Sequence, residues 1–577
     1  MNWTVLSGIL SGFLLTIGST YGAPDPHDAL FNAEQYPSAK QCAQCHGQIF
    51  EEWRSSAHAY ASISPMFHKF EQTINDLSQG TIGSFCMRCH ATVGTTMGEE
   101  RHIPLWERSQ VSREGITCIT CHRINEAYSK VNGERRVVPG DIHAAVYGGI
   151  GGDGIKKIIE QKDEFRVAPT KEEAARGMAI HSEGKYFSQL NKSEFCVSCH
   201  QVAVNAGIKL EVVWDQYRAS PAFKEGTSCQ DCHMSTSPGK PTGFSKGPVA
   251  VVNGKSINSE RTHYDHSFVG PGYPITHPGI FPHNLQADKL DKTMQEWLEF
   301  DWRAGWGTDD FEERVEDGKE KVTFPASWED VDDRFDAREV IDNNLAKLEE
   351  KRTLRKALME NGSHIDGPFF ASPPKAGETL KFHVKITNKN NGHNLPSGSL
   401  GAQPELWLNV AVIDPDGKNI WESGYLDRNG DFCDLHSLSV REGLMPRDKQ
   451  LFNLQTKFLT TNVKGTEREM YLPVNMDVDQ LPFLRPAAVP TTVLNHQPFV
   501  RMEARSLPPL ASRNANYSVP AKVMEKAGTY KIAVRMRSRA EPIYFMRFVG
   551  ATEEMERGMN EWMLDAHPYT VEFEVKK

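Results

Sequence analysis

The chain has 577 residues, of which 39% are hydrophobic, and its formal net charge at pH 7 is -10. This length is sufficient for two or more domains with cores of their own. Charges of both signs are spread along the chain without a long basic run, which weighs against a nucleic-acid partner.

The first residues predict export. Residues 3–17 are apolar but too few for a membrane span, and the small residues Thr20 and Gly22 follow them. We therefore expect residues 1–22 to be a secretory signal peptide. The alternative is an uncleaved anchor, because only the free amine at the start is positively charged. In both cases the body of the protein lies outside the cytoplasm, in the periplasm or at the cell surface. Membrane contact is expected only through an uncleaved N-terminal segment.

The cysteines form a repeated motif. Ten of the eleven lie in five Cys-x-x-Cys-His pentads. The composition would produce only about 0.01 such pentads by chance. In chain order the pentads contain Cys42, Cys45 and His46; Cys86, Cys89 and His90; Cys118, Cys121 and His122; Cys196, Cys199 and His200; and Cys229, Cys232 and His233.

This spacing has a chemical reason. Two thiols three positions apart can form thioethers to the two vinyl groups of one haem, and the histidine that follows is placed to ligate the iron. A zinc ribbon does not need a histidine after every second cysteine, and a dithiol enzyme does not need five copies. The motifs therefore predict five covalently attached c-type haems. The eleventh cysteine, Cys433, is expected to be a buried free thiol, with a reactive thiol or an intermolecular bridge as alternatives.

The second half of the motif region repeats the first. The second and third pentads start 32 residues apart, and the fourth and fifth start 33 apart. Each interval holds one tryptophan, Trp106 or Trp214. The repeat implies two related haem pairs with the same local fold. Closely packed haems conduct electrons, whereas an isolated haem binds gases or carries out chemistry.

Three segments resemble multihaem cytochromes c: residues 52–59 (EWRSSAHA), 114–118 (EGITC) and 229–234 (CQDCHM). By this resemblance the chain is similar to the tetrahaem cytochrome c of nitrifying bacteria. Its haems are expected to pack as they do in hydroxylamine oxidoreductase. The resemblance covers about residues 40–285. This chain has five motifs where hydroxylamine oxidoreductase has eight, and it lacks the Cys-x-x-Cys-Lys pentad of many pentahaem nitrite reductases. Both departures weigh against an enzyme.

Each haem iron has a sixth coordination position. A histidine there produces a low-spin iron suited to electron transfer, whereas an open position permits substrate binding. By the resemblance, His58 is expected to cap the iron held by His122, and His143 the iron held by His46. A surface or hydrogen-bonded histidine is the alternative for each. The candidates from motif context are His58, His143, His181 and His266.

The fifth distal ligand is not assigned by the sequence. His393 lies in an Asn-Gly-His-Asn-Leu-Pro turn of the next domain, and similar turns follow the haem region in related proteins. If one iron is open, the resemblance favours the haem at His90, because the nitrifier-type relative leaves its second haem without a protein ligand. The remaining candidates are His68, His102, His263, His277 and His283.

The pattern changes after the last motif. Residues 293–370 are charged and have helical periodicity. From residue 371 apolar side chains alternate, for example over residues 380–387, 406–412, 530–536 and 569–575. The predicted fold is α+β: a mainly helical and loop pentahaem cytochrome domain over residues 23–292, a helical connecting region over 293–370, and an antiparallel β-sandwich over 371–577.

Three function classes remain. The repeated haem pairs favour an electron-transfer protein that works through closely packed, mostly bis-histidine haems. The unassigned fifth ligand keeps open an oxidoreductase of a small nitrogen or sulfur compound at one open haem. A structural or adhesive surface protein is the third class. Expected partners are periplasmic or membrane-associated redox proteins, such as quinol-oxidising membrane cytochromes or other multihaem cytochromes. The acidic charge favours a positively charged partner surface.

Overall fold

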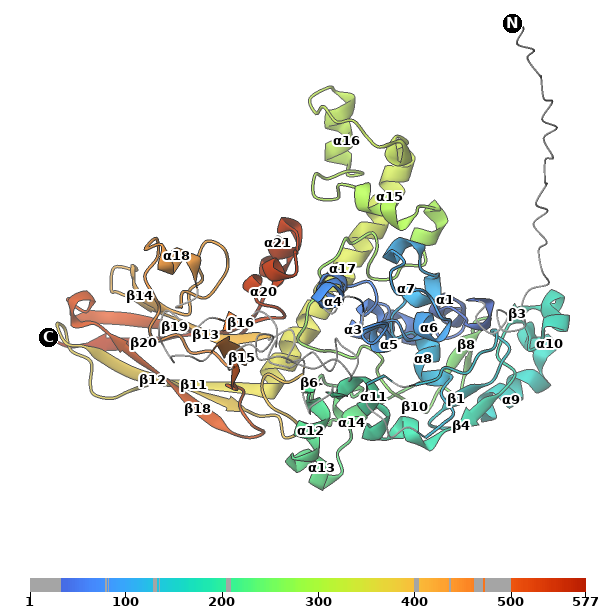
Figure 1. Cartoon of the computed structure of the whole chain (residues 1–577), viewed down its shortest axis with the longest axis horizontal. Coiled ribbons are helices and arrows are strands. Elements are labelled where there is room, and N and C mark those ends of the chain that lie inside the picture. The colour runs from blue at the N-terminus through green and yellow to red at the C-terminus, as the bar shows by residue number, and fades with distance from the viewer. Residues whose placement is uncertain are drawn as a thin grey trace, which may run out of the picture.

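The computed structural model describes residues 33–577 apart from 78–79, 81, 128–131, 134, 204–208, 399–403, 435–436, 461–470 and 473–499. The expected signal peptide lies outside the described residues. Among the described residues, no helix is both long enough and apolar enough to cross a membrane. The chain is of the α+β class, with helices toward the N-terminal side and antiparallel sheets toward the C-terminal side (Figure 1).

The motif region consists of short helices joined by long loops (Figure 1). Its helices are α1 (Ala39–Ala43), α2 (Gly47–Trp53), α3 (Ala57–Tyr60), α4 (Pro65–Leu77), α5 (Met87–His90), α6 (Thr92–Thr96), α7 (Gln110–Arg113), α8 (Cys118–His122), α9 (Asp153–Glu160), α10 (Lys162–Phe165), α11 (Val197–His200), α12 (Val213–Arg218), α13 (Pro221–Glu225) and α14 (Cys229–His233). Its two-stranded sheets are formed by β1 (Val146–Gly148), β2 (Val167–Ala168), β3 (Met178–Ala179), β4 (Gly184–Tyr186), β5 (Val202–Ala203), β6 (Lys209–Glu211), β7 (Ser245–Gly247), β8 (Ala250–Val252), β9 (Lys255–Ile257) and β10 (Arg261–His263).

Side-chain caps start several of these helices. Ser56 accepts a hydrogen bond from the backbone N–H of Ala59 at the start of α3. At the start of α14, Ser228 and Asp231 form a reciprocal capping box. Such caps satisfy backbone donors that a helix of four or five residues cannot satisfy internally, so they define where these helices begin. The protein atoms here form separate small apolar clusters, such as the one around Val93 and Ile119.

A long helix joins the two parts of the molecule. Helix α17 (Val331–Gly362) follows α15 (Met294–Glu299) and α16 (Asp309–Glu316), and it lies between the motif region and the sheets (Figure 1). Toward the motif region, Asn344 accepts a hydrogen bond from Arg54 Nη1 at 3.2 Å. Toward the C-terminal part, the guanidinium of Arg352 lies over the ring of Trp562. Helix α17 therefore packs against both the motif region and the C-terminal part.

The C-terminal part contains two larger antiparallel sheets. The strand order is β11-β12-β18 in one and β14-β13-β19-β20 in the other. Both sheets contribute to one hydrophobic cluster, for example through Val384 and Ile386 of the first and Val410 and Ile532 of the second. Both sheets therefore share one core. Strand β11 lies within residues 293–370, the region expected to be the helical connector. The elements are β11 (Ser363–Phe370), β12 (Leu380–Asn388), β13 (Glu405–Ile413), β14 (Asn419–Ser423), α18 (Leu438–Arg441), β15 (Lys457–Thr460), β16 (Tyr471–Leu472), β17 (Val500–Glu503), β18 (Ser512–Val519), β19 (Gly528–Arg539), α20 (Ile543–Phe548), α21 (Glu553–Glu561) and β20 (Leu564–Val575).

Candidate haem sites

Each pentad coincides with a short helix, α1, α5, α8, α11 or α14, or runs directly out of one. In helical geometry, residues three and four positions apart lie on the same face. The two thiols and the histidine of one pentad are therefore presented together. All ten pentad cysteines are free thiols of intermediate exposure, so they remain available for attachment. Cys433, in contrast, is fully buried and unbridged, as expected for a structural thiol.

The pentad histidines are held in a form that can ligate iron. Burial lowers the pKa of all five below the usual value, so their rings are neutral at pH 7. In three of them the Nδ1 atom contacts a backbone carbonyl, which leaves Nε2 free as a metal ligand. These contacts are His46 to Val249 O at 2.7 Å, His90 to Ala61 O at 3.2 Å, and His122 to Tyr147 O at 2.7 Å.

Three pentad histidines face a second histidine across a gap. A metal bound at about 2 Å by one nitrogen of each imidazole would hold the two ring centroids roughly 6 Å apart. The observed centroid separations fit this geometry, so the residues present fit a bis-histidine haem. The pairs are His58 with His200 at 6.3 Å, His122 with His266 at 6.4 Å, and His233 with His393 at 6.2 Å.

The pairing of His58 differs from the expectation, which placed it opposite His122. The backbone does approach the third pentad: Ile116 N–H donates to His58 O at 3.0 Å, and Gly115, with φ +67°, makes this close approach sterically feasible. The side chain, however, points toward His200. The ring of Phe268 packs 4.3 Å from that of His58. In this structure the ring of His58 therefore faces the fourth pentad, and ligation of the fourth haem by His58 becomes a proposal.

The first pentad has a different neighbour from the one expected. Burial first, and then the proximity of the His46 imidazole, lower the pKa of His181 to about 4. His143 instead donates its backbone N–H to Asp141 at 3.0 Å, and its Nδ1 contacts Ile180 O at 3.2 Å. The structure therefore places His181 near His46, and His143 beside Asp141 and Ile180.

The second pentad has distinct surroundings. The ring of Phe67 stacks on that of His90, with centroids 4.0 Å apart and planes 9° apart. His68 lies nearby, but its Nε2 contacts Ser62 O at 2.6 Å. His102 is exposed and contacts Glu100. Within the described part of the chain, no second imidazole faces His90 in a ring contact; three further histidines lie outside the described residues, at positions 27, 436 and 496.

The other candidates serve the protein framework. His277 and His283 each contact a backbone carbonyl through Nε2, at 2.8 and 3.2 Å, and His283 also stacks on Trp53. His263 forms an ion pair with Glu52 at 2.7 Å. None of the three faces a pentad histidine in the way that His58, His266 and His393 do.

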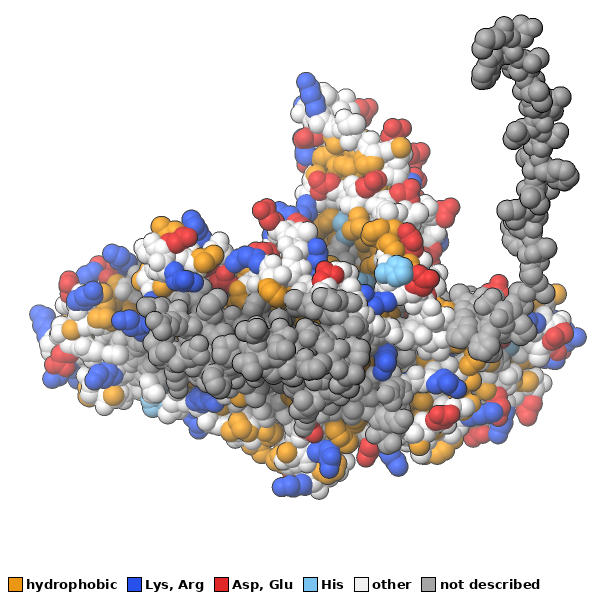
Figure 2. Space-filling view, in the orientation of Figure 1, with side chains coloured by type: hydrophobic (Ala, Val, Ile, Leu, Met, Phe, Trp, Pro, Cys, Tyr) orange, Lys and Arg blue, Asp and Glu red, His pale blue; other side chains and the backbone are white. Residues whose placement is uncertain are grey.

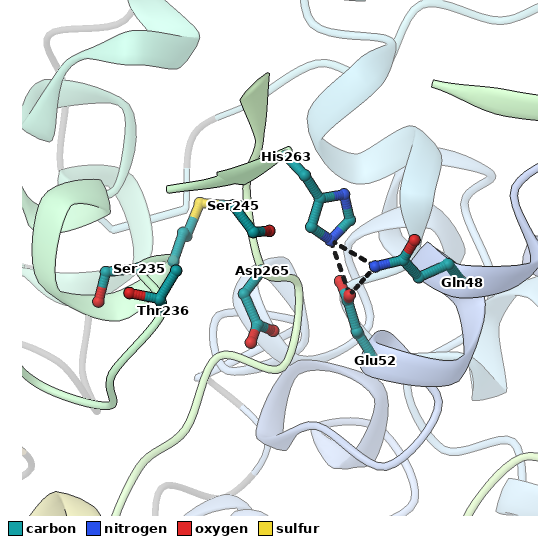
Figure 3. Close-up of a pocket in the computed structure, with 8 residues that line it drawn as sticks. Gln48, Glu52, Ser235, Thr236, Ser245, His263 and Asp265 are labelled. Atoms are coloured by element: carbon teal, nitrogen blue, oxygen red, sulfur yellow. Dashed lines mark hydrogen bonds and ion pairs between the residues drawn. The ribbon is translucent and has the colours of Figure 1, made fainter. Parts of the chain in front are cut away.

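The ion pair of Glu52 and His263 lines a polar cavity of about 240 Å³ (Figure 3). The other Glu52 oxygen accepts the backbone N–H of His266 at 3.0 Å. Burial alone would raise the pKa of Glu52, but hydrogen bonds from His263 and His266 lower it below its usual value. Hydrogen bonding to Glu52 raises the pKa of His263. Glu52 thus fixes the backbone that carries His266, a role that the resemblance of residues 52–59 did not indicate.

Thiols of different pentads contact each other. Cys42 lies close to Cys118, Cys89 close to Cys199, and Cys196 close to Cys229. Because each thiol is an attachment point, these contacts bring the first pentad beside the third, the second beside the fourth, and the fourth beside the fifth. The sequence repeat indicated that the fourth and fifth pentads are neighbours, but it could not show that the first lies beside the third or the second beside the fourth.

One family comparison agrees with this chemistry. The family described as "Cytochrome c554 and c-prime" matches residues 41–123, which contain the first three pentads. A penta-haem cytochrome c552 from Thermochromatium tepidum aligns over 94% of this chain and 99% of its own, with 14% identity and a TM-score of 0.46. An alkylpurine DNA glycosylase from Pseudomonas fluorescens aligns over 51% of this chain and 70% of its own, with 9% identity and a TM-score of 0.14. No curated protein matches the chain.

The attachment motifs and the family match over three of them define a c-type haem protein. Because the motif recurs, the protein is a multihaem c-type cytochrome.

Proposed function

We propose that this cytochrome carries five covalent haems and relays electrons between redox partners outside the cytoplasm. The observation that carries the proposal is the set of facing histidine pairs at 6.2 to 6.4 Å. When bound, haem supplies an iron that accepts and releases one electron. Two histidines on one iron leave no coordination position for a substrate, which suits a carrier.

The thiol contacts support a route through the protein. The first pentad touches the third, and the fourth touches the second and the fifth. The third and fourth are neighbours because Cys121 lies near Cys199. The proposed order is therefore first, third, fourth and fifth, with the second as a branch at the fourth. Electron transfer slows steeply with distance, so this adjacency would favour rapid internal relay.

A specific observation favours a second function at the second pentad. Phe67, rather than an imidazole, packs against His90. An iron held by His90 alone would have an open position, which could bind a small nitrogen or sulfur compound. We regard reduction or oxidation of such a compound as the alternative function of this protein. We propose that the haems of the five pentads pack as they do in the nitrifier-type cytochrome and in hydroxylamine oxidoreductase.

Export and partners belong to the same proposal. We infer that residues 1–22 direct the chain to the periplasm or the cell surface, where haem attachment to exported apoprotein would occur. The two-layered sheets are proposed to pack and dock rather than to react. Proposed partners are quinol-oxidising membrane cytochromes or other multihaem cytochromes.

Electron paramagnetic resonance of the oxidised holoprotein tests the proposal. Four or five low-spin signals are expected, together with reversible reduction of every haem. Two or more high-spin haems would contradict the carrier function. Rapid turnover of nitrite, hydroxylamine or nitric oxide would instead favour the alternative.

A further inference from the structure

Residues 132, 133 and 135 are inserted between the second and fourth pentads. Gly133 N–H donates to Ser198 O at 2.7 Å, and Asn132 N–H donates to Gln201 O at 3.3 Å. A Cβ atom on Gly133, whose φ is +68°, would lie only 2.7 Å from Cys89 Sγ. Only glycine fits this position without displacing the thiol. The backbone therefore carries Arg135 into the junction of the two pentads.

The Arg135 side chain is held at this junction. Its guanidinium carbon lies 4.0 Å from the centroid of the Phe195 ring, and Phe195 directly precedes the fourth pentad. This is the geometry of a cation–π contact. The positive charge of Arg135 therefore lies between the second pentad, whose Cys89 is approached by Gly133, and the fourth pentad, which Phe195 directly precedes.

The junction of the first and third pentads has a different charge pattern. Beside Cys42 and Cys118, where the first and third pentads meet, Glu114 and Arg123 act with opposite signs on Cys42. Arg135 instead adds a positive charge at the point where the proposed route branches. Arginine keeps this charge at any physiological pH, so its effect would be permanent.

We propose that the positive charge of Arg135 raises the reduction potentials of the haems around it, most strongly that of the haem of the fourth pentad. Reduction lowers the charge at the iron by one, so a nearby cation stabilises the reduced form. Electrons would then collect at the fourth haem before passing to the second or fifth. This inference rests on the proposed electron-transfer function and specifies where electrons reside within it.

The test is a redox titration of the holoprotein followed by electron paramagnetic resonance, with the Arg135→Gln, Arg135→Lys and Arg136→Gln variants. The component that disappears in His58→Ala identifies the fourth haem. Arg135→Gln is expected to shift its reduction equilibrium about tenfold toward the oxidised form, which is about 59 mV for one electron. Arg135→Lys keeps the charge and should retain most of the potential. Arg136 is the next side chain but exposed, so Arg136→Gln should leave the potential unchanged.

Equal potentials in Arg135→Gln and Arg136→Gln would overturn the inference. A fall in Arg135→Lys as large as in Arg135→Gln would also overturn it, because a packing role would then explain both. A wild-type protein without low-spin bis-histidine signals would contradict the proposed function itself. Intact signals with unmoved potentials would contradict only the role of Arg135.

Discussion

The imidazoles of His58 and His200 face each other with ring centroids 6.3 Å apart and planes tilted by 41°. His58 belongs to α3 near the start of the motif region, and His200 ends α11 much later in the chain. One iron between them would join these two segments by coordinate bonds. Haem ligation and folding of the motif region are therefore expected to be coupled.

Replacement of His58 by alanine tests this pairing. In His58→Ala we expect one of the haems, that of the fourth pentad, to lose its sixth ligand and become high spin. Electron paramagnetic resonance and the visible spectrum should both report the change. His143→Ala is the control, because His143 faces no pentad histidine in a ring contact, and its spectrum should match the wild type. Loss of the low-spin signal of the third-pentad haem would instead show that His58 is paired with His122.

The number of haems can be measured directly. A pyridine haemochrome assay against protein mass should give five haems per chain. Cys118→Ser should weaken attachment of one haem and destabilise the motif region, because the haem would fill space that the small apolar clusters leave. Cys433→Ser is the matched control, since Cys433 lies in no pentad. Fully matured protein with four haems or fewer would refute the assignment.

Carbon monoxide distinguishes the carrier from the enzyme. If only the haem at His90 is open, carbon monoxide should shift the spectrum of about one-fifth of the ferrous haem, in proportion to one of the five motifs. The signal should double in His58→Ala, where a second iron is opened. If all five irons carry two histidines, the wild type should react slowly or not at all. A rapid shift of most of the haem would contradict both functions.

The free energy of unfolding should fall as the pH rises from about 4.5 to about 7, because Glu541 loses its proton over this range. Burial raises the pKa of this carboxyl from about 4.5 to about 7, and its charge acts on Tyr60 of α3. The folded state thus holds a proton that the unfolded state releases above pH 4.5, so the stabilisation is present below that pH and is lost between pH 4.5 and 7. Glu541→Gln should remove this dependence, with a gain of at most about 3 kcal/mol at pH 8.

Denaturant unfolding of the holoprotein at pH 5 and pH 8 measures this effect. Glu525→Gln is the control, because Glu525 is exposed, and it should keep the wild-type pH dependence. An unchanged pH dependence in Glu541→Gln would show that other groups are responsible.

The attachment chemistry follows from the sequence by itself. The two thiols and the proximal histidine of each pentad lie within five residues, so a single helical turn brings them together whatever the rest of the fold does. The C-terminal strands were also predictable, because alternation of apolar side chains is a local pattern: the runs at 380–387 and 530–536 lie within β12 and β19.

The tertiary structure decided which distant histidine faces the pentad histidines His122, His200 and His233. The backbone of His58 contacts the segment before the third pentad, whereas its ring faces the fourth pentad. Only the packing of the folded chain determines which pentad each part of His58 meets. His393 reaches His233 from the domain of the sheets. Arg135 acts at a junction because Gly133 permits a close approach to Cys89. Facing pairs join segments that are far apart in the chain, so no local pattern in the sequence encodes them.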